Sequence, residues 1–110
     1  EDMMMQVIYN LIDNAVKFTP QNGYIEFKTY RDKEKLFVSI KNSGAGIERE
    51  EADKIFERFY KIDKSRSYDV KGAGLGLYLV KSIVELHGGQ IVCNSKLNEY
   101  TQFVFWLPNV

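Results

Sequence analysis

The chain is predicted to fold as an α+β domain, a two-layer sandwich in which three helices cover one face of a mixed β-sheet. Segments with helical periodicity alternate with segments in which apolar and polar residues alternate, and two of the latter follow one another as a hairpin. The length of 110 residues suits a single core. The composition, 45% apolar and 14% aromatic, is that of a globular protein rather than a disordered one.

The first half of the chain is predicted to form a helix and then a β-hairpin. Asp2 is the expected N-cap, apolar residues recur at helical spacing over 7–16, and Pro20 ends the run. Asn22-Gly23 predicts a turn. Apolar residues then alternate over 25–29 and 36–40, on either side of a polar turn, which is typical of a hairpin.

The second half is predicted to contain two more helices and two more strands. Helical periodicity returns from about Glu48, with one apolar face formed by Ile55, Phe56 and Phe59. Residues 61–71 have no sustained period and are predicted to be a loop. The third helix runs from Tyr78 to His87 and stops at Gly88-Gly89, a usual C-terminal signal. Two strands follow, near 90–95 and 101–107.

Charge and cysteine content exclude several classes of function. Fifteen basic and fifteen acidic residues cancel, so no electrostatic footprint for nucleic acid or an anionic membrane exists. No apolar run approaches the ~20 residues that a membrane span requires. Cys93 lies within an apolar alternation, which predicts a buried thiol, and one cysteine with one histidine argues against a zinc site. These features predict a cytoplasmic domain.

The most informative motif is Gly72 to Leu77, in which glycine occupies every second position directly before the third helix. The N-terminus of a helix presents unpaired N–H groups and attracts anions such as phosphate. Leu77 fills the sixth position, which excludes G-x-G-x-x-G, and no P-loop lysine follows. By itself the run is compatible with a phosphate cradle or with a flexible loop that leads into a core helix.

Two further groups of residues are candidates for ligand binding. Gln6, Asn10, Asn14 and Lys17 form a polar stripe on the first helix, where an amide oxygen suits Mg²⁺ and an amide N–H or lysine suits phosphate. A second glycine pair occurs in 42–47, between a strand and a helix. The alternative for the stripe is a solvated helix face, and the alternative for the glycine pair is a tight turn.

Two other features have a single expectation or a pair of them. The basic loop 61–71 is either a lid or simply an exposed loop, and His87 is expected to cap its helix.

Taken together and in order, these motifs resemble the boxes of bacterial sensor histidine kinases. Residues 6–20 resemble the N box and 42–47 the first glycine box. Residues 55–61 resemble the F box, and 72–77 the second glycine box. The similarity continues through 80–89 and 103–108, so it covers nearly the whole chain. It implies the Bergerat-type ATP-binding fold that these kinases share with gyrase, heat-shock chaperones and mismatch-repair ATPases.

The resemblance also implies a ligand set, carried over by position. Asn10 would ligate Mg²⁺, with Asn14 and Lys17 near the phosphates of ATP, and Phe18 and Lys61 would border the nucleotide. Asn42 would read the adenine amino group, and Gly44, Gly46 and Ile47 would shape the base pocket. The lid and the phosphate contacts would come from Gly72, Gly74, Leu75, Gly76 and Leu77.

Three departures from the family pattern accompany this assignment. Position 42 is usually Asp, and its amide here can donate as well as accept, which bears on the choice between ATP and GTP. Asn98-Glu99-Tyr100 stands where glycines are expected, so no ligand role is assigned there. Family domains normally begin with a strand upstream of the first helix. We therefore expect a fragment that lacks this strand and the acceptor-histidine domain.

The predicted activity is transfer of the γ-phosphate of Mg-ATP to a histidine on a separate dimerisation domain, which in turn serves a response regulator. His87 does not resemble the acceptor, because Gly88 follows it. One alternative is an ATP hydrolase of the same superfamily, but its general-base Glu is replaced here by Gln6, so we expect negligible ATPase activity from the chain alone. The other is a pseudokinase that only docks partners.

Overall fold

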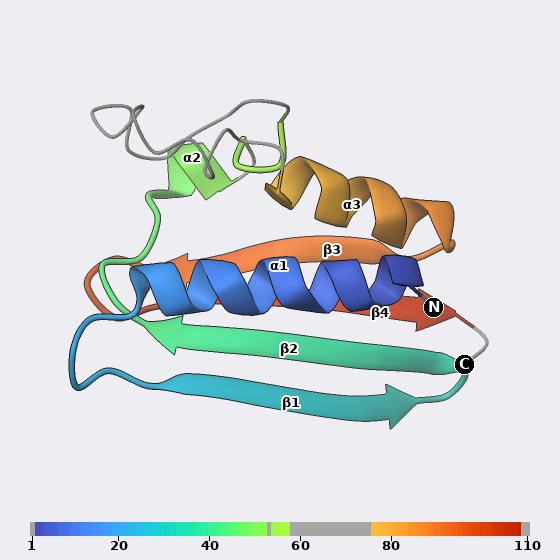
Figure 1. Cartoon of the computed structure of the whole chain (residues 1–110), viewed down its shortest axis with the longest axis horizontal. Helices are drawn as coiled ribbons and strands as arrows, with labels where there is room; N and C mark the ends of the chain where they lie inside the picture. Colours follow the sequence, from blue (N-terminus) through green and yellow to red (C-terminus); the bar gives the residue numbers. More distant parts are fainter. Residues whose placement is uncertain (1, 53, 58–75, 109–110) are drawn as a thin grey trace.

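The computed structural model describes residues 2–52, 54–57 and 76–108. Their elements, in order, are α1 (Asp2–Phe18), β1 (Ile25–Asp32), β2 (Lys35–Ser43), α2 (Arg49–Ala52), α3 (Gly76–Leu86), β3 (Gln90–Lys96) and β4 (Tyr100–Pro108). Helices α1 and α3 pack against each other on one face of the sheet (Figure 1). This arrangement confirms the predicted two-layer α+β fold.

The sheet has the strand order β1-β2-β4-β3, and every neighbouring pair is antiparallel. The prediction of a mixed sheet is therefore wrong for the described part of the chain. Strands β2 and β3 do run in the same direction, as the helical crossover between them requires. Strand β4 returns between them, so the two parallel strands never bond to each other.

Helix α1 buries a narrower face than its sequence pattern predicts. Val7 and Leu11 are fully buried and Ala15 is nearly so, whereas Ile12 and Val16 are 37% and 59% exposed. The apolar residues at helical spacing over 7–16 span a wider arc of the helix than the arc that the sheet and α3 cover. The half-buried Asn10 and Asn14 flank the buried stripe on the side opposite Ile12.

The core lies between the sheet and the two long helices. Alternate residues of β2 and β4 point into it, and Phe103 and Phe105 are its largest members. Phe56 packs edge-on against Phe103, with ring centroids 6.0 Å apart. Each such buried side chain contributes roughly 1.5–3 kcal/mol of hydrophobic stabilisation. The predicted core role of Phe56 and Ile55 is confirmed, since they are 8% and 1% exposed.

Helix α2 is shorter than predicted. The described helix ends at Ala52, and Ile55 and Phe56 lie in the turns that follow it. Hydrogen bonds from the N–H groups of Lys54 and Ile55 to the carbonyl of Glu51 hold these turns. The apolar period therefore identified the buried residues correctly but not the backbone conformation. Phe59 lies outside the described residues.

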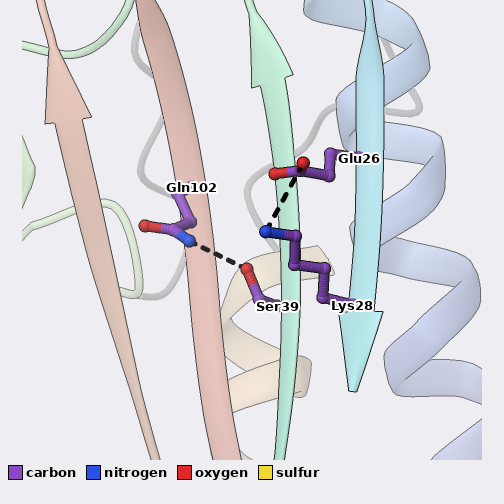
Figure 2. A network of polar contacts seen from close by, with 4 residues as sticks. All are labelled: Glu26, Lys28, Ser39 and Gln102. Carbon is purple, nitrogen blue, oxygen red and sulfur yellow. Dashed lines mark hydrogen bonds and ion pairs between the residues drawn. The ribbon is translucent and has the colours of Figure 1, made fainter. Parts of the chain in front are cut away.

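The face of the sheet that points away from the helices carries polar and aromatic side chains. The Nε2 of Gln102 on β4 donates to the hydroxyl of Ser39 on β2 at 2.8 Å, and Lys28 pairs with Glu26 along β1 at 3.6 Å (Figure 2). Ser39 is only 6% exposed, so its hydrogen bond matters more than the ion pair, whose side chains are both solvent-accessible.

Helix α3 ends in a Schellman motif, as the glycine signal predicted. Gly88 adopts φ +87°, its N–H donates to Glu85, and the N–H of Gly89 donates to Val84. The Nδ1 of His87 lies 2.8 Å from the Ile83 carbonyl oxygen, so the predicted structural role of this histidine at the helix end is confirmed.

Replacement of Gly89 is expected to disturb the junction between α3 and the sheet. A Cβ atom at this position would overlap the carbonyl oxygen of Trp106 in β4. Gly89→Ala should therefore lower the free energy of unfolding by about 1–3 kcal/mol in urea denaturation. The control is Asn94→Ala, an exposed β3 position expected to change stability by less than about 0.5 kcal/mol. Equal effects of the two substitutions would contradict the packing argument.

Candidate functional site

Several of the predicted site residues lie at one end of the molecule. The C-terminal end of α1, the end of β2 and the turn between β3 and β4 meet there (Figure 1). Gly44 lies between them: a Cβ atom at this position would be 2.7 Å from the Phe18 carbonyl oxygen, and its N–H donates to the Glu99 carbonyl at 3.2 Å. The close approach explains why residue 44 is glycine.

Asn42 is a buried polar residue at this end of β2. Its side chain is 3% exposed, and its Nδ2 donates to the backbone carbonyl of Ser43 at 2.9 Å. This bond fixes the orientation of the amide, because only the NH₂ group donates. The Oδ1 atom accepts no hydrogen bond from the described part of the chain. It is therefore the atom of Asn42 that is available to accept a hydrogen bond from a ligand.

Thr101 is a second buried polar residue beside Asn42 that sequence reasoning missed. It is 7% exposed and lies directly opposite Asn42 in the β2–β4 register. Both residues belong to the core-facing set of their strands. The signal that would have found it is the register between β2 and β4. That register joins residues about sixty positions apart and is not visible in either strand alone.

The loop after β2 is attached to the β3–β4 turn. The N–H of Ile47 donates to the Ser95 hydroxyl at 2.6 Å, and the Asn98 N–H donates to the Ala45 carbonyl at 2.6 Å. Gly46 adopts φ +77°, and a Cβ atom there would lie 2.5 Å from the Lys96 carbonyl oxygen. Glycine is therefore favoured at both positions of the predicted pair, at 44 by a close backbone approach and at 46 by a close approach and a positive φ.

The residues that replace the glycines expected at 98–100 fit this turn without entering the site. Asn98 adopts φ +65°, a conformation that asparagine tolerates better than most residues. Tyr100 lies on the face of the sheet away from the helices, where the Nζ of Lys41 is 4.3 Å from its ring centroid. The side chain of Tyr100 is thus directed away from Asn42 and Thr101.

The polar stripe of α1 lies beside the buried face of the helix. Asn10 and Asn14 are half-buried, whereas Gln6 is exposed. The Nζ of Lys17 is 3.7 Å from Asp13, and this lysine side chain is 34% exposed. A solvent-exposed pair of this kind contributes little to stability, so Lys17 can exchange its partner for a ligand at small cost. Phe18 is 49% exposed at the helix end.

Only the last part of the second glycine motif lies within the described residues. Gly76 begins α3, and Leu77 is partly buried against the core. The first turn of α3 contains no acidic residue that would compete with an anion at the helix N-terminus. A Cβ atom at Gly76 would meet no atom of the described residues within 4 Å. Lys61, Gly72, Gly74 and Leu75 lie outside the described residues, and their predicted roles stay predictions.

Comparison with known proteins places this arrangement in a family. A family model described as histidine kinase-, DNA gyrase B-, and HSP90-like ATPase matches residues 1–110. The chain is 38% identical over 98% of its length to the sensor histidine kinase WalK of Bacillus subtilis, and 40% identical over 97% to the sensor protein SrrB of Staphylococcus aureus. It spans about a fifth of the length of these relatives, 18% in each case.

Solved structures agree with the sequence relatives. The nucleotide-free catalytic domain of the histidine kinase ThkA superposes with a TM-score of 0.83 at 34% identity, over 98% of this chain and 67% of that one. Full-length ShkA in complex with AMPPNP gives 0.82 at 27% identity, over 96% of this chain and 21% of that one. The chain therefore belongs to the histidine kinase-, DNA gyrase B- and HSP90-like ATPases, among the catalytic domains of sensor histidine kinases.

Proposed function

We propose that this chain binds Mg-ATP and positions the γ-phosphate for transfer to a histidine on a separate dimerisation domain of the same sensor kinase. The observation that carries the proposal is the junction at the end of β2. There the amide of Asn42, whose oxygen accepts no hydrogen bond from the described residues, lies beside a glycine loop held against the β3–β4 hairpin. Because the family match to ATPases covers the whole chain, we interpret this junction as a nucleotide-binding site.

The base would bind at Asn42. Its Oδ1 atom would accept a hydrogen bond from the adenine amino group, while Gly44, Gly46 and Ile47 would provide the surface against which the ring lies. Glycine at 44 and 46 keeps side-chain atoms away from this surface. Thr101, buried opposite Asn42, is a further polar group at the base end of the site.

The phosphates would lie between the polar flank of α1 and the start of α3. The Asn10 side chain would supply an amide oxygen to Mg²⁺, and the metal would neutralise charge on the phosphates. The remaining ligands would be oxygen atoms of the phosphates and of water, as is usual for Mg²⁺ at a nucleotide. Asn14, Lys17 and the N-terminus of α3 would supply donors to the phosphates.

Phosphoryl transfer rather than hydrolysis is the outcome that this chain favours. Hydrolysis requires a base that activates water, and the candidate position on α1 holds Gln6, an exposed side chain that cannot accept a proton at neutral pH. The acceptor histidine would come from the dimerisation domain of the same protein, and the phosphoryl group would then pass to a response regulator.

We assign this chemistry to the cytoplasm. Within the part of the chain that the structure describes, no helix has the length and apolarity to span a membrane.

Removal of the proposed metal ligand is expected to weaken nucleotide binding without unfolding the chain. Asn10→Ala should raise the Kd for ATP at least tenfold, about 1.4 kcal/mol, when Mg²⁺ is present, and much less when the metal is chelated. Isothermal titration with and without Mg²⁺ measures both values. The control is Gln6→Ala, one turn earlier on the same stripe, which should leave both values unchanged. Absence of any ATP binding by the unmutated chain would favour the docking-module alternative instead.

The orientation of Asn42 predicts that the chain prefers ATP to GTP. One N–H of its Nδ2 is bonded to Ser43, which orients the amide, and we expect the Oδ1 atom to face the base; an acceptor matches the amino group of adenine and not the carbonyl of guanine. The Kd for GTP should exceed that for ATP at least tenfold in a direct titration. Equal or tighter binding of GTP would contradict the assignment of Asn42 to adenine.

A further inference from the structure

The loop from Gly44 to Ile47 is held by the β3–β4 hairpin through hydrogen bonds of three of its residues. Gly44 donates to the Glu99 carbonyl at 3.2 Å, Ala45 accepts from the Asn98 N–H at 2.6 Å, and the N–H of Ile47 donates to the Ser95 hydroxyl at 2.6 Å. The first two contacts join backbone atoms and are compatible with many side chains. The third depends on one side chain, that of Ser95.

The Ser95 hydroxyl uses both of its hydrogen-bonding functions. It accepts from the N–H of Ile47 and donates to the Tyr100 carbonyl at 3.0 Å. The same oxygen therefore joins the loop to both strands of the hairpin. Ile47 is only 6% exposed, so its side chain lies within the core on one side while its N–H is held by Ser95.

Among the described residues, the Ser95 hydroxyl is the acceptor to which the Ile47 N–H is bonded. Gly46 already approaches the hairpin so closely that a Cβ atom there would lie 2.5 Å from the Lys96 carbonyl and 3.0 Å from the Ser95 hydroxyl. The loop backbone at Gly46 therefore lies close to the hairpin. Without the hydroxyl, the N–H of Ile47 would lose its partner, and the loop would relax away from the hairpin.

We propose that Ser95 is a positioning residue that sets the base specificity of the nucleotide site, acting through Ile47 and Gly46. The inference rests on the proposed function, because the same loop would form the surface against which adenine lies. Ser95 touches no part of the nucleotide in this scheme. It fixes the distance between the loop and the Oδ1 atom of Asn42, and that distance decides whether a ring on the loop can reach the acceptor.

The test compares Ser95→Ala with Ser95→Thr, which keeps the hydroxyl, and with Ser39→Ala. Ser39 is the matched control, because it is a buried serine of the same sheet whose hydroxyl accepts a hydrogen bond from Gln102 at 2.8 Å on the opposite face (Figure 2). Kd values for Mg-ATP and Mg-GTP are measured at a temperature at which urea titration shows every variant to be folded. Hydrogen exchange of the Ile47 amide is followed by NMR.

Ser95→Ala is expected to raise the Kd for ATP about tenfold, to reduce the ratio of the GTP to the ATP Kd by a similar factor, and to accelerate exchange of the Ile47 amide. A tenfold change corresponds to about 1.4 kcal/mol. Ser95→Thr should restore the ATP affinity to within about twofold of the original. Ser39→Ala should leave both Kd values and the Ile47 exchange rate unchanged.

Three results would overturn the inference. The first is faster exchange of the Ile47 amide in Ser95→Ala with unchanged ATP affinity, which would make the contact structural only. The second is an equal loss of ATP and GTP affinity in Ser95→Ala, and the third is an equal loss of affinity in Ser39→Ala. Either of these two would point to general destabilisation. Failure of the proposed function is recognised separately, because the unmutated chain would then not bind ATP at all.

Discussion

The pairing of β4 between β2 and β3 is the constraint on which the site depends. Because β4 enters the centre of the sheet, its register with β2 places Thr101 opposite Asn42 and brings the β3–β4 turn over the loop that follows β2. The same pairing directs Phe103 and Phe105 into the core. A slip of one residue would exchange the two faces of β4, burying Tyr100 and exposing the phenylalanines. Core packing and site geometry are thus specified by one register.

Helix α1 divides its circumference between a buried apolar stripe and a polar stripe. Val7 and Leu11 anchor the helix in the core, and Asn10 and Asn14 follow along one edge of that buried stripe. Burial of Leu11 fixes the rotation of the helix about its own axis. Because successive residues are 100° apart around that axis, the directions of the two asparagines are then fixed as well. The apolar contacts therefore orient the polar stripe. On the other side of the buried stripe, Ile12 and Val16 are left exposed by the described part of the chain.

Local sequence patterns predicted most of the fold, because its elements are built from short-range signals. The hairpin follows from two alternating runs around a polar turn, and the end of α3 follows from Gly88. Sheet order and strand direction could not be predicted in the same way. They depend on where β4 inserts, which is decided by contacts between distant residues. Likewise, the glycine pair pointed to the loop at 44–47, but the role of Ser95 follows only from a hydrogen bond that spans forty-eight positions.

The exchange of the usual carboxylate for the amide of Asn42 is physically consistent with this environment. A carboxylate at a position that is 3% exposed would pay a desolvation penalty and would face the Ser43 carbonyl without a proton to donate. The amide avoids both costs, because its NH₂ group bonds to that carbonyl and it carries no charge, while its oxygen stays able to accept a hydrogen bond. The amide therefore keeps a hydrogen-bond acceptor at this position, as the proposed contact with adenine requires, and changes only the means by which that acceptor is held in place.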